Sequence, residues 1–553
     1  MLYYMIISRP NATVLLRSIH ITTSRVHKLY QIMLPESVMK QSLSTLFPQL
    51  SPGKRAFLTG TLLLTGTGFL CRVLGFFYRI FLSRTIGAEG LGLFNMIHPV
   101  YGICFALCAG SIQTSLSQLI ASKAGRGRSI FRTGLLISMT MAFILATLIC
   151  RNSDFLAQCI LMEPRCAVYL PLMGISVPFA AFHACINGYY YGMQKAKIPA
   201  FSQVAEQVVR MSLVFLIADT WLRQNREITV HLAVIGHLIG EIAAAVFTFL
   251  CMLLVPPQPG ARNMESAAVG TVTTLKETVG PLMSLALPLM GNRLVLNLLS
   301  SAEAIWIPSR LQMSGLSNSD SVSIYGVLTG MAMPFILFPS AITNSMAVLL
   351  LPGVAQAQAN GHKKQIITSI SISLRYSMYM GIFCIGIFTQ FGNALGISVF
   401  HNGDAGRYIQ ILAWLCPFLY LATTIGSILN GLGNTRTTFL QNTAALLLRI
   451  AFVLIGIPRF GIFAYLCGML VSEIFLAFLH LWSLKRRVPF NWNAWEMIVK
   501  PTVLVWISTG ILHFANAFVP WPAGFPIFMQ AALQICFLGI CYGGLLLSFH
   551  RNG

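Results

Sequence analysis

The chain has 553 residues, of which 56% are hydrophobic and only 9% are charged, and its mean hydropathy is +0.73. Soluble domains usually have about a quarter of their residues charged, so this composition excludes a soluble globular protein and favours a polytopic helical membrane protein. Basic loops on one side of a membrane explain the net charge of +22 better than nucleic acid does, and we expect no nucleic-acid partner.

The N-terminal segment, residues 1–55, differs in composition from the rest of the chain. Basic residues precede its first acid, Glu36, and the segment is rich in Ser and Thr. Transit peptides share this composition, and a true start at Met33 or Met39 is another alternative. We interpret the segment as a disordered cytoplasmic extension.

From Ala56 onward, apolar segments of bilayer length follow one another, and several contain proline, such as Pro99, Pro178 and Pro288. Membrane helices tolerate proline at kinks, whereas the interiors of soluble helices avoid it. A membrane-crossing helix needs about 20 apolar residues, and on this basis the sequence predicts an all-α fold with about fourteen transmembrane helices.

The loops indicate the orientation. Basic groups such as Lys363–Lys364 and Lys485–Arg487 occur in loops on the side of the N-terminus, whereas acids such as Asp154 and Asp404 occur on the other side. Cytoplasmic loops are enriched in Lys and Arg. We therefore predict a multi-pass protein of the bacterial cytoplasmic membrane with both termini in the cytoplasm.

An internal repeat relates the two halves of the chain. The segment GMQKAKIPAFSQVAEQVVR, which ends at Arg210, aligns without a gap with GLGNTRTTFLQNTAALLLR, which ends at Arg449. Downstream, GHLIGEI and GMLVSEI align Glu241 with Glu473. The two halves then have the same orientation, which indicates parallel repeats, an architecture that transporters use.

The repeat predicts two six-helix lobes followed by two C-terminal helices. We assign the N-lobe to residues 56–256, a cytoplasmic linker between the lobes to 257–279, the C-lobe to 280–487, and the last two helices with a short tail to 488–553.

Three arginines in the apolar segments have no acid within helical reach: Arg72, Arg79 and Arg293. A charge at membrane depth costs roughly 2.5–3.5 kcal/mol on insertion scales, so it marks a functional site unless it reaches an interface. Arg72 and Arg79 are seven residues apart and share a helix face, and Arg79 is expected near the outer interface. If the first and seventh helices line a cleft, the three arginines converge there and suit the pyrophosphate of a substrate.

Acids at membrane depth have a structural interpretation as well as a functional one. Glu206 precedes Arg210 by four residues, the favoured helical pairing, and Arg210–Glu241 and Arg449–Glu473 are expected ties within each lobe. Candidates for ion coupling or intra-lobe ion pairs are therefore Glu206, Arg210, Glu241, Glu303, Arg449 and Glu473.

We expect neither a metal site nor a cofactor. No CxxC spacing occurs among the 13 cysteines, which we interpret as small packing residues. His98, His183 and His237 show no metal-ligand spacing and are interpreted as core histidines. The membrane potential or a coupled monovalent cation remains as the source of energy.

The segment RVLGFFYRIFLSRTIGAEGLGLF, residues 72–94, resembles the first-hairpin signature of the oligosaccharide and lipid flippases in the multidrug/oligosaccharidyl-lipid/polysaccharide exporter superfamily, in particular the stage V sporulation protein B-like family. The resemblance covers about residues 56–550 and implies two lobes arranged in a V. It also implies that Arg72 and Arg79 face the cavity, whereas the match around Arg293 is weaker.

The resemblance implies export of polyprenyl-pyrophosphate-linked saccharides such as the peptidoglycan precursor lipid II. We therefore expect a flippase that acts as a monomer by alternating access, with the lipid-linked substrate and the bilayer as its partners. One alternative is a cation-coupled multidrug exporter of the same superfamily. A polyprenyl-sugar glycosyltransferase is disfavoured because no acidic pair occurs in an outer loop, and we expect no enzymatic activity.

Overall fold

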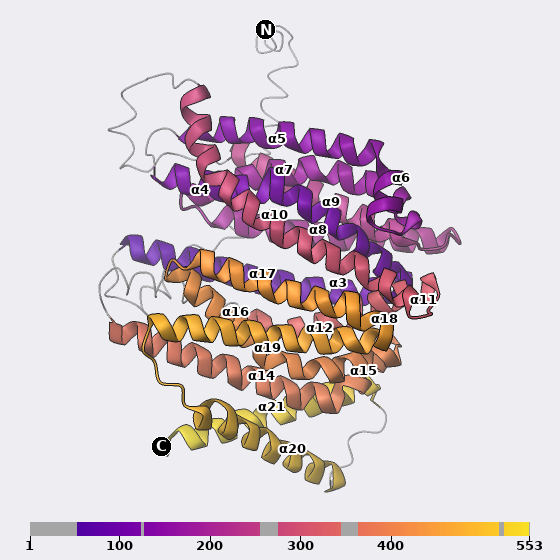
Figure 1. Ribbon diagram of the computed structural model, residues 1–553, viewed down its shortest axis with the longest axis vertical. Helices are drawn as coiled ribbons and strands as arrows, with labels where there is room; N and C mark the ends of the chain where they lie inside the picture. Colours follow the sequence, from indigo (N-terminus) through magenta and orange to yellow (C-terminus); the bar gives the residue numbers. More distant parts are fainter. Residues whose placement is uncertain (1–51, 123–126, 255–274, 344–362, 519–524, 552–553) are drawn as a thin grey trace, which may run out of the picture.

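The structure, a computed structural model, describes residues 52–122, 127–254, 275–343, 363–518 and 525–551 (Figure 1). Within these ranges the chain forms helices and no strand, as predicted. The extension expected at residues 1–55 and the linker expected at 257–279 fall mainly outside the described residues.

The helices of the first half are α3 (Pro52–Phe105), η1 (Ala106–Gly110), α4 (Ser111–Ser122), α5 (Gly127–Arg151), α6 (Ser153–Phe155), η2 (Leu156–Ile160), η3 (Pro164–Val168), α7 (Leu170–Gly192), α8 (Lys197–Arg223) and α9 (Val230–Leu254). Those of the second half are α10 (Leu275–Met313), α11 (Asn318–Gly326), η6 (Val327–Ala332), α12 (Met333–Leu337), α14 (Lys363–Phe400), α15 (Gly403–Leu412), η7 (Ala413–Leu415), α16 (Cys416–Gly431), α17 (Thr435–Ala451), η8 (Phe452–Gly456), α18 (Ile457–Phe460) and α19 (Ile462–Arg487). The chain ends with η9 (Trp495–Val499), α20 (Lys500–Phe518) and α21 (Ile527–Arg551).

In the described ranges, 13 helical stretches are long and apolar enough to cross a membrane. The first of them, Leu63–Ser122, has 60 residues and is interrupted at Gly87, whose φ of 71° and ψ of −175° are not helical. Glycine adopts this conformation without steric cost, so the chain turns there and the stretch crosses the membrane twice. Because the first stretch crosses twice, the 13 described stretches provide fourteen crossings, which confirms the expected count of about fourteen.

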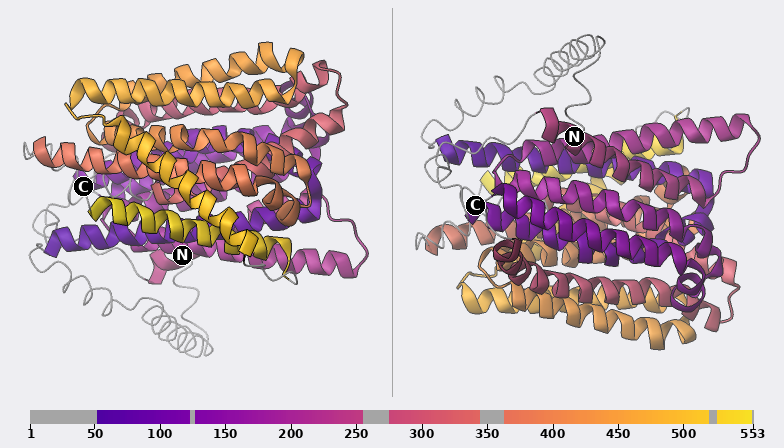
Figure 2. Two further views of the ribbon diagram at one scale, coloured as in Figure 1. Left: turned by 90° about the horizontal axis from the view of Figure 1, so that it is seen from below. Right: turned by 90° about the horizontal axis from the view of Figure 1, so that it is seen from above.

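The long helices run nearly parallel to one another and form two groups (Figures 1 and 2). The first group packs α4, α5, α7, α8 and α9 together, and the second packs α14, α15, α16, α17 and α19 together. Helices α3 and α10 contact members of both groups, while α20 and α21 pack on α14. The beginning of α3 and the end of α21 lie at the same end of the bundle (Figure 1).

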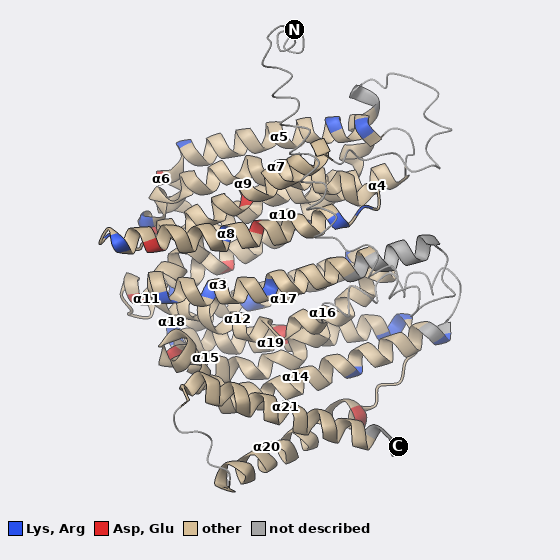
Figure 3. Cartoon of the chain, turned by 180° about the vertical axis from the view of Figure 1, so that it is seen from behind, with Lys and Arg blue, Asp and Glu red and all other residues tan. Residues whose placement is uncertain are grey.

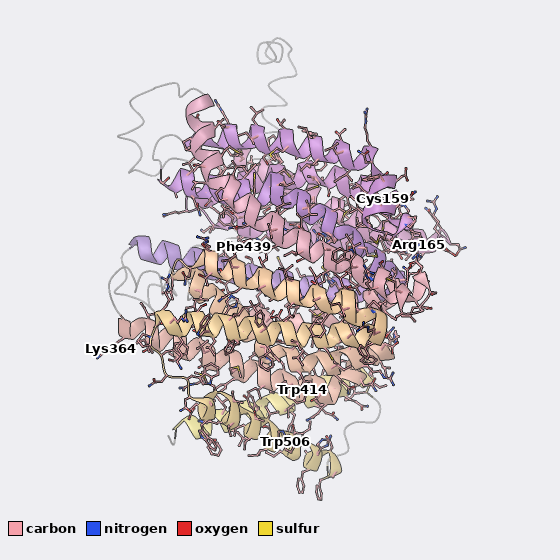
Figure 4. All side chains as sticks on the ribbon, viewed as in Figure 1. Cys159, Arg165, Lys364, Trp414, Phe439 and Trp506 are labelled. Carbon is pink, nitrogen blue, oxygen red and sulfur yellow. The ribbon has the colours of Figure 1, made fainter. Side chains whose placement is uncertain are left out.

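Charged residues lie toward the two ends of the bundle and at scattered positions between them (Figure 3). Lys364 and Arg165 mark opposite ends, and Trp506, which is 78% exposed, lies at the edge formed by α20 (Figure 4). Large apolar side chains on the outside of the bundle suit contact with lipid tails.

Helices α3 and α11 cross closely near the end marked by Arg165. Gly92 and Gly326 form the crossing point, and the Asn95 side-chain amide donates to Thr329 Oγ1 at 2.9 Å one turn further along. Helix α3 of the first half and helix α11 of the second half are therefore in contact at this end of the bundle.

Candidate substrate-binding site

Arginine lines three of the cavities that the described residues form within the helix bundle. The histidine cavity, of about 130 Å³, is lined by His98 and His237 together with Arg79 and Arg210. The Arg79 cavity, of about 300 Å³, shares Arg79 and His98 with the first and extends to α10 and η6. The Arg293 cavity, of about 400 Å³, lies between α4, α7 and α10.

Arg79 is hydrogen-bonded to a backbone carbonyl of η6 that accepts no hydrogen bond within η6 itself. Its Nη1 donates to the carbonyl oxygen of Thr329 at 3.2 Å. In the π-helical turn η6, the N–H of Met333 bonds to the carbonyl of Leu328, five residues earlier. The next bond in this pattern would need an N–H from Pro334, which proline lacks, so the Thr329 carbonyl is free to accept from the guanidinium. Arg79 thus faces two internal cavities, whereas the sequence had suggested the outer interface.

Arg293 reaches its cavity because small residues bring α10 close to the helix opposite. Its Nη2 donates to Thr114 Oγ1 at 3.0 Å. A methyl group on Gly110 would overlap the Arg293 guanidinium, and one on Gly102 would lie 3.2 Å from Asn297 Oδ1. Gly102 and Gly110 are eight residues apart and therefore share a helix face. Asn297, one turn beyond Arg293, lines the Arg79 cavity, so α10 connects the two cavities.

Arg72 does not join the other two arginines. It is exposed on α3, lines none of the three cavities, and forms no hydrogen bond or ion pair with another described residue. Its apolar neighbours Phe69 and Phe77 are 41% and 55% exposed. The structure therefore separates the predicted cluster: Arg79 and Arg293 line adjoining cavities, and Arg72 lies on an open face of the same helix as Arg79.

The chemistry of the cavities suits an anion. No Asp or Glu appears among the described residues that line any of the three. The remaining polar lining of the Arg293 cavity consists of neutral hydroxyl and amide groups: Gln113, Thr114, Ser117, Gln118 and Tyr191. Guanidinium groups bind phosphate oxygens through charge-assisted hydrogen bonds, and hydroxyl and amide groups can donate to and accept from sugar hydroxyls.

A polar cluster in the first group of helices surrounds Glu241, which is 5% exposed. Its Oε2 lies 2.8 Å from His183 Nε2, and the Tyr101 hydroxyl donates to its Oε1 at 2.8 Å. His237 Nε2 lies 3.9 Å from Oε1. The sequence analysis missed this cluster, although the spacing of four residues between His237 and Glu241 places both on one helix face.

A second polar cluster ties α10 to α17 and α19. Arg449 Nη2 donates to Glu303 Oε2 at 3.0 Å, and its Nη1 lies 3.7 Å from Glu473 Oε1. The Tyr465 hydroxyl donates to Glu303 Oε1 at 2.6 Å. The expected contact between Arg449 and Glu473 is therefore present, but Glu303 is the nearer partner.

The equivalent tie between Arg210 and Glu241 is absent from the described residues, which corrects the sequence-based expectation. Arg210 pairs instead with Glu206, one turn earlier on α8. Because Glu206 and Arg210 both lie on α8, the pair forms whatever the position of α9. Glu241 is already bonded to His183 and Tyr101.

Outside the membrane-crossing helices, Arg165 joins two acids at one end of the bundle (Figure 4). Its Nε lies 2.7 Å from Glu163 Oε1 and its Nη1 lies 2.5 Å from Glu89 Oε1. Burial favours the neutral form of Glu163, but the hydrogen bonds and charge of Arg165 outweigh burial and hold the pKa of Glu163 below its ordinary value. The network links the turn between the first two crossings to the segment before α7.

Comparison with known proteins identifies the family. The sequence profile of the family described as "Polysaccharide biosynthesis protein" matches residues 57–358, more than half of the chain. The chain belongs to this family. The resemblance that the first hairpin carries is thereby confirmed.

Within the polysaccharide biosynthesis protein family, the chain is 26% identical over 475 residues to "Stage V sporulation protein B" of Bacillus subtilis (strain 168), covering 84% of this chain and 90% of that protein. Its fold is similar to the solved structure "Lipid II flippase MurJ, inward closed conformation", with a TM-score of 0.68 and 14% identity over 89% of this chain and 99% of that one. It is also similar to an inward-facing multidrug resistance MATE family transporter of the MOP superfamily, with a TM-score of 0.60 and 13% identity over 76% of this chain and 94% of that one. The chain is a multi-pass membrane protein with a transporter fold.

Proposed function

We propose that this protein moves a polyprenyl-pyrophosphate-linked saccharide across the bacterial cytoplasmic membrane by alternating access. The substrate is the peptidoglycan precursor lipid II or a related precursor of cell-wall or spore-cortex polysaccharide. The observation that carries the proposal is the pair of adjoining cavities that contain Arg79 and Arg293 and, in their described lining, no carboxylate.

In this mechanism the pyrophosphate replaces the neutral partners of the two arginines. Arg79 and Arg293 donate only to a backbone carbonyl and a threonine hydroxyl, so an incoming phosphate competes with neutral acceptors and displaces no carboxylate. Charge-assisted bonds are roughly twice as strong as neutral ones, which favours the exchange. The polyprenyl chain stays in lipid, and the saccharide lies against the hydroxyl and amide groups of the Arg293 cavity.

Rocking of the N-lobe against the C-lobe then opens the cavities to opposite sides in turn. The contact of α3 with α11 closes one end of the bundle, and basic residues such as Lys364 lie at the other end. By the positive-inside rule, the end with Lys364 is cytoplasmic, as are both termini. The protein works as a monomer, driven by the membrane potential or a coupled monovalent cation.

A cation-coupled drug exporter is the second candidate function for a protein with this fold. An exporter of cationic drugs needs an acid in its binding cavity, and the described lining of these cavities contains arginine instead. The deciding experiment places purified protein in liposomes with labelled lipid II and follows protection of the label from a membrane-impermeant reagent. Protein-dependent exchange of lipid II between leaflets supports the proposal, and an inert protein refutes it.

A further inference from the structure

The histidine cavity collects buried polar atoms that lack a partner. Tyr78 Oη, His98 Nδ1, Arg210 Nε and His237 Nε2 are buried and form no hydrogen bond with other described residues, and all four residues line this cavity. Buried polar groups are nearly always bonded to protein or to water. A water needs roughly 10–15 Å³ of such volume, so a cavity of about 130 Å³ has room for several.

Glu241, next to this cavity, is a buried carboxylate that has no arginine or lysine partner among the residues that the structure describes. Arg210 is paired with Glu206, and the contacts of Glu241 are with His183, Tyr101 and, more distantly, His237. A buried charge without a counter-charge is strongly destabilising. The His183–Glu241 pair therefore needs one additional proton, either as a neutral carboxyl beside a neutral ring or as an imidazolium beside a carboxylate.

Asn187 fits both charge states of His183. Its Nδ2 lies 3.5 Å from His183 Nδ1, and its Oδ1 is buried without a partner. When the pair has lost its proton, the neutral ring donates its Nε2–H to the Glu241 carboxylate, and the Asn187 amide nitrogen donates to Nδ1. With the imidazolium, a rotated amide presents Oδ1 to accept from Nδ1–H, and the unpartnered oxygen is satisfied.

We infer that the His183–Glu241 pair is an exchangeable proton-binding site, connected to the histidine cavity through His237. The proton leaves the pair through His237 Nε2, 3.9 Å from Glu241, to water in the cavity, and it returns by the same route. The ionisable groups that face the pair or its cavity come from four membrane crossings: Cys71, Tyr78, Arg79, His98, Tyr101, Glu206, Arg210 and His237.

The donors favour a proton over a metal ion. In the part of the chain that the structure describes, no group of three or more His, Cys, Asp or Glu residues is arranged to hold a metal. Both Glu241 oxygens face groups that carry or accept protons, His183 and Tyr101. The equivalent cluster around Arg449 has Glu303, Glu473 and Tyr465 and no histidine among its described contacts, so of the two clusters only the one around Glu241 contains a side chain of the type that titrates near neutral pH.

The position of the site gives the proton a role in the proposed transport cycle, and this consequence rests on the proposed function. Arg79 lines both the histidine cavity and the Arg79 cavity. Loss of the proton leaves a net negative charge beside the histidine cavity, and this charge attracts Arg79 across the cavity and competes with a phosphate bound to it, whereas protonation removes the competition. Proton binding and pyrophosphate binding are therefore mutually favourable.

Infrared difference spectroscopy on the purified full chain tests the site without any substrate. Between about pH 5 and 8, wild type is expected to lose a carboxyl or imidazolium signal that Glu241→Gln and His183→Gln both remove. Glu163→Gln and His480→Gln, which change a buried carboxylate and a buried histidine elsewhere, should keep it. If one of the two variants Glu241→Gln and His183→Gln folds poorly, the spectrum of the other variant tests the inference. A spectrum without a signal that depends on the pair overturns the inference.

Transport tests the consequence in the same preparations. For one coupled proton, an imposed gradient should shift the steady-state distribution of lipid II between leaflets about tenfold per pH unit in wild type and not at all in Glu241→Gln. If the distribution of lipid II in wild type does not change with the imposed pH gradient, proton coupling of transport is refuted, even if the His183–Glu241 site titrates. If wild type does not move lipid II at all, the proposed function fails, and the infrared result alone decides the proton site.

Discussion

Gly92 of α3 and Gly326 of α11 meet where the two helices cross, and a methyl group on Gly326 would lie 2.7 Å from the Gly92 backbone nitrogen and overlap the Ala88 carbonyl. The two glycines are 234 residues apart, between the offsets of 239 and 232 that relate Arg210 to Arg449 and Glu241 to Glu473. Gly92 lies in the second crossing and Gly326 in the eighth, so the contact joins corresponding helices of the two halves at this end of the bundle. Alternating access requires this contact to open and re-form.

Gly326→Ala should loosen this crossing, because neither backbone can yield without moving a whole helix. Overpacking of this kind costs about 1–3 kcal/mol. The measurement is the labelling rate of a cysteine introduced at Leu91, which is 1% exposed. We expect faster labelling with Gly326→Ala than without it. Gly68→Ala, whose added methyl meets nothing within 4 Å, is the control, and equal rates in all three backgrounds would contradict the role of the crossing.

Gly110→Ala should impair transport while it leaves every charge in place. The added methyl would overlap the Arg293 guanidinium and push it away from Thr114. We expect weaker binding of a pyrophosphate lipid and slower transport. Gly291→Ala is the matched control on α10. Its added methyl group lies in open space, two residues from Arg293, and the variant should behave as wild type. Equal impairment of the two variants would show that the effect is general to these helices.

The Arg449 cluster is expected to be structural. Glu303→Gln leaves Arg449 with only the 3.7 Å contact to Glu473, and breaking a buried pair typically costs 3–5 kcal/mol. Folded yield should therefore fall. The double variant Glu303→Gln/Arg449→Gln removes both charges of the nearer pair and should recover part of the yield. Normal yield with lost transport in the single variant would instead assign the cluster to ion coupling.

The Arg165–Glu163 pair should make stability depend on pH in the acidic range. The pKa of Glu163 lies below its ordinary value of 4.5, so the pair stabilises the folded state above that pH. This contribution is lost as the pH falls through the lowered pKa of the folded state. Thermal unfolding of wild type and Arg165→Gln should differ fully above about pH 4.5 and converge below it. A difference that is constant across this range would contradict the assignment.

Composition and the repeat predicted the fold well, because bilayer crossing imposes long apolar helices that hydropathy detects. The π-helical turn of η6 was not predictable in the same way. Its consequence, the free Thr329 carbonyl that holds Arg79, depends on how Pro334 is accommodated in three dimensions.

The site was predicted in part. Arg79 and Arg293 were found because isolated charges at membrane depth stand out in the sequence, but their separation from Arg72 depends on the rotation of α3. The His183–Glu241 pair joins residues 58 apart on different helices, and no local spacing reveals such a contact. For Arg210 the sequence offered two partners, Glu206 through helical spacing and Glu241 through the repeat, and the structure shows that only the pair with Glu206 forms.

The most direct measurement of the central claim compares Arg293→Ala and Arg293→Lys with wild type in liposomes, using lipid II and an uncharged analogue of the same lipid. Loss of a membrane-embedded cation eases insertion, so lost transport cannot be attributed to poor folding. We predict that Arg293→Ala abolishes lipid II transport, that lysine, which keeps the charge but not the planar fork, retains part of it, and that the preference for the charged lipid disappears with alanine. Wild-type transport by Arg293→Ala, with the preference for the charged lipid intact, would contradict the claim that this cavity binds the pyrophosphate.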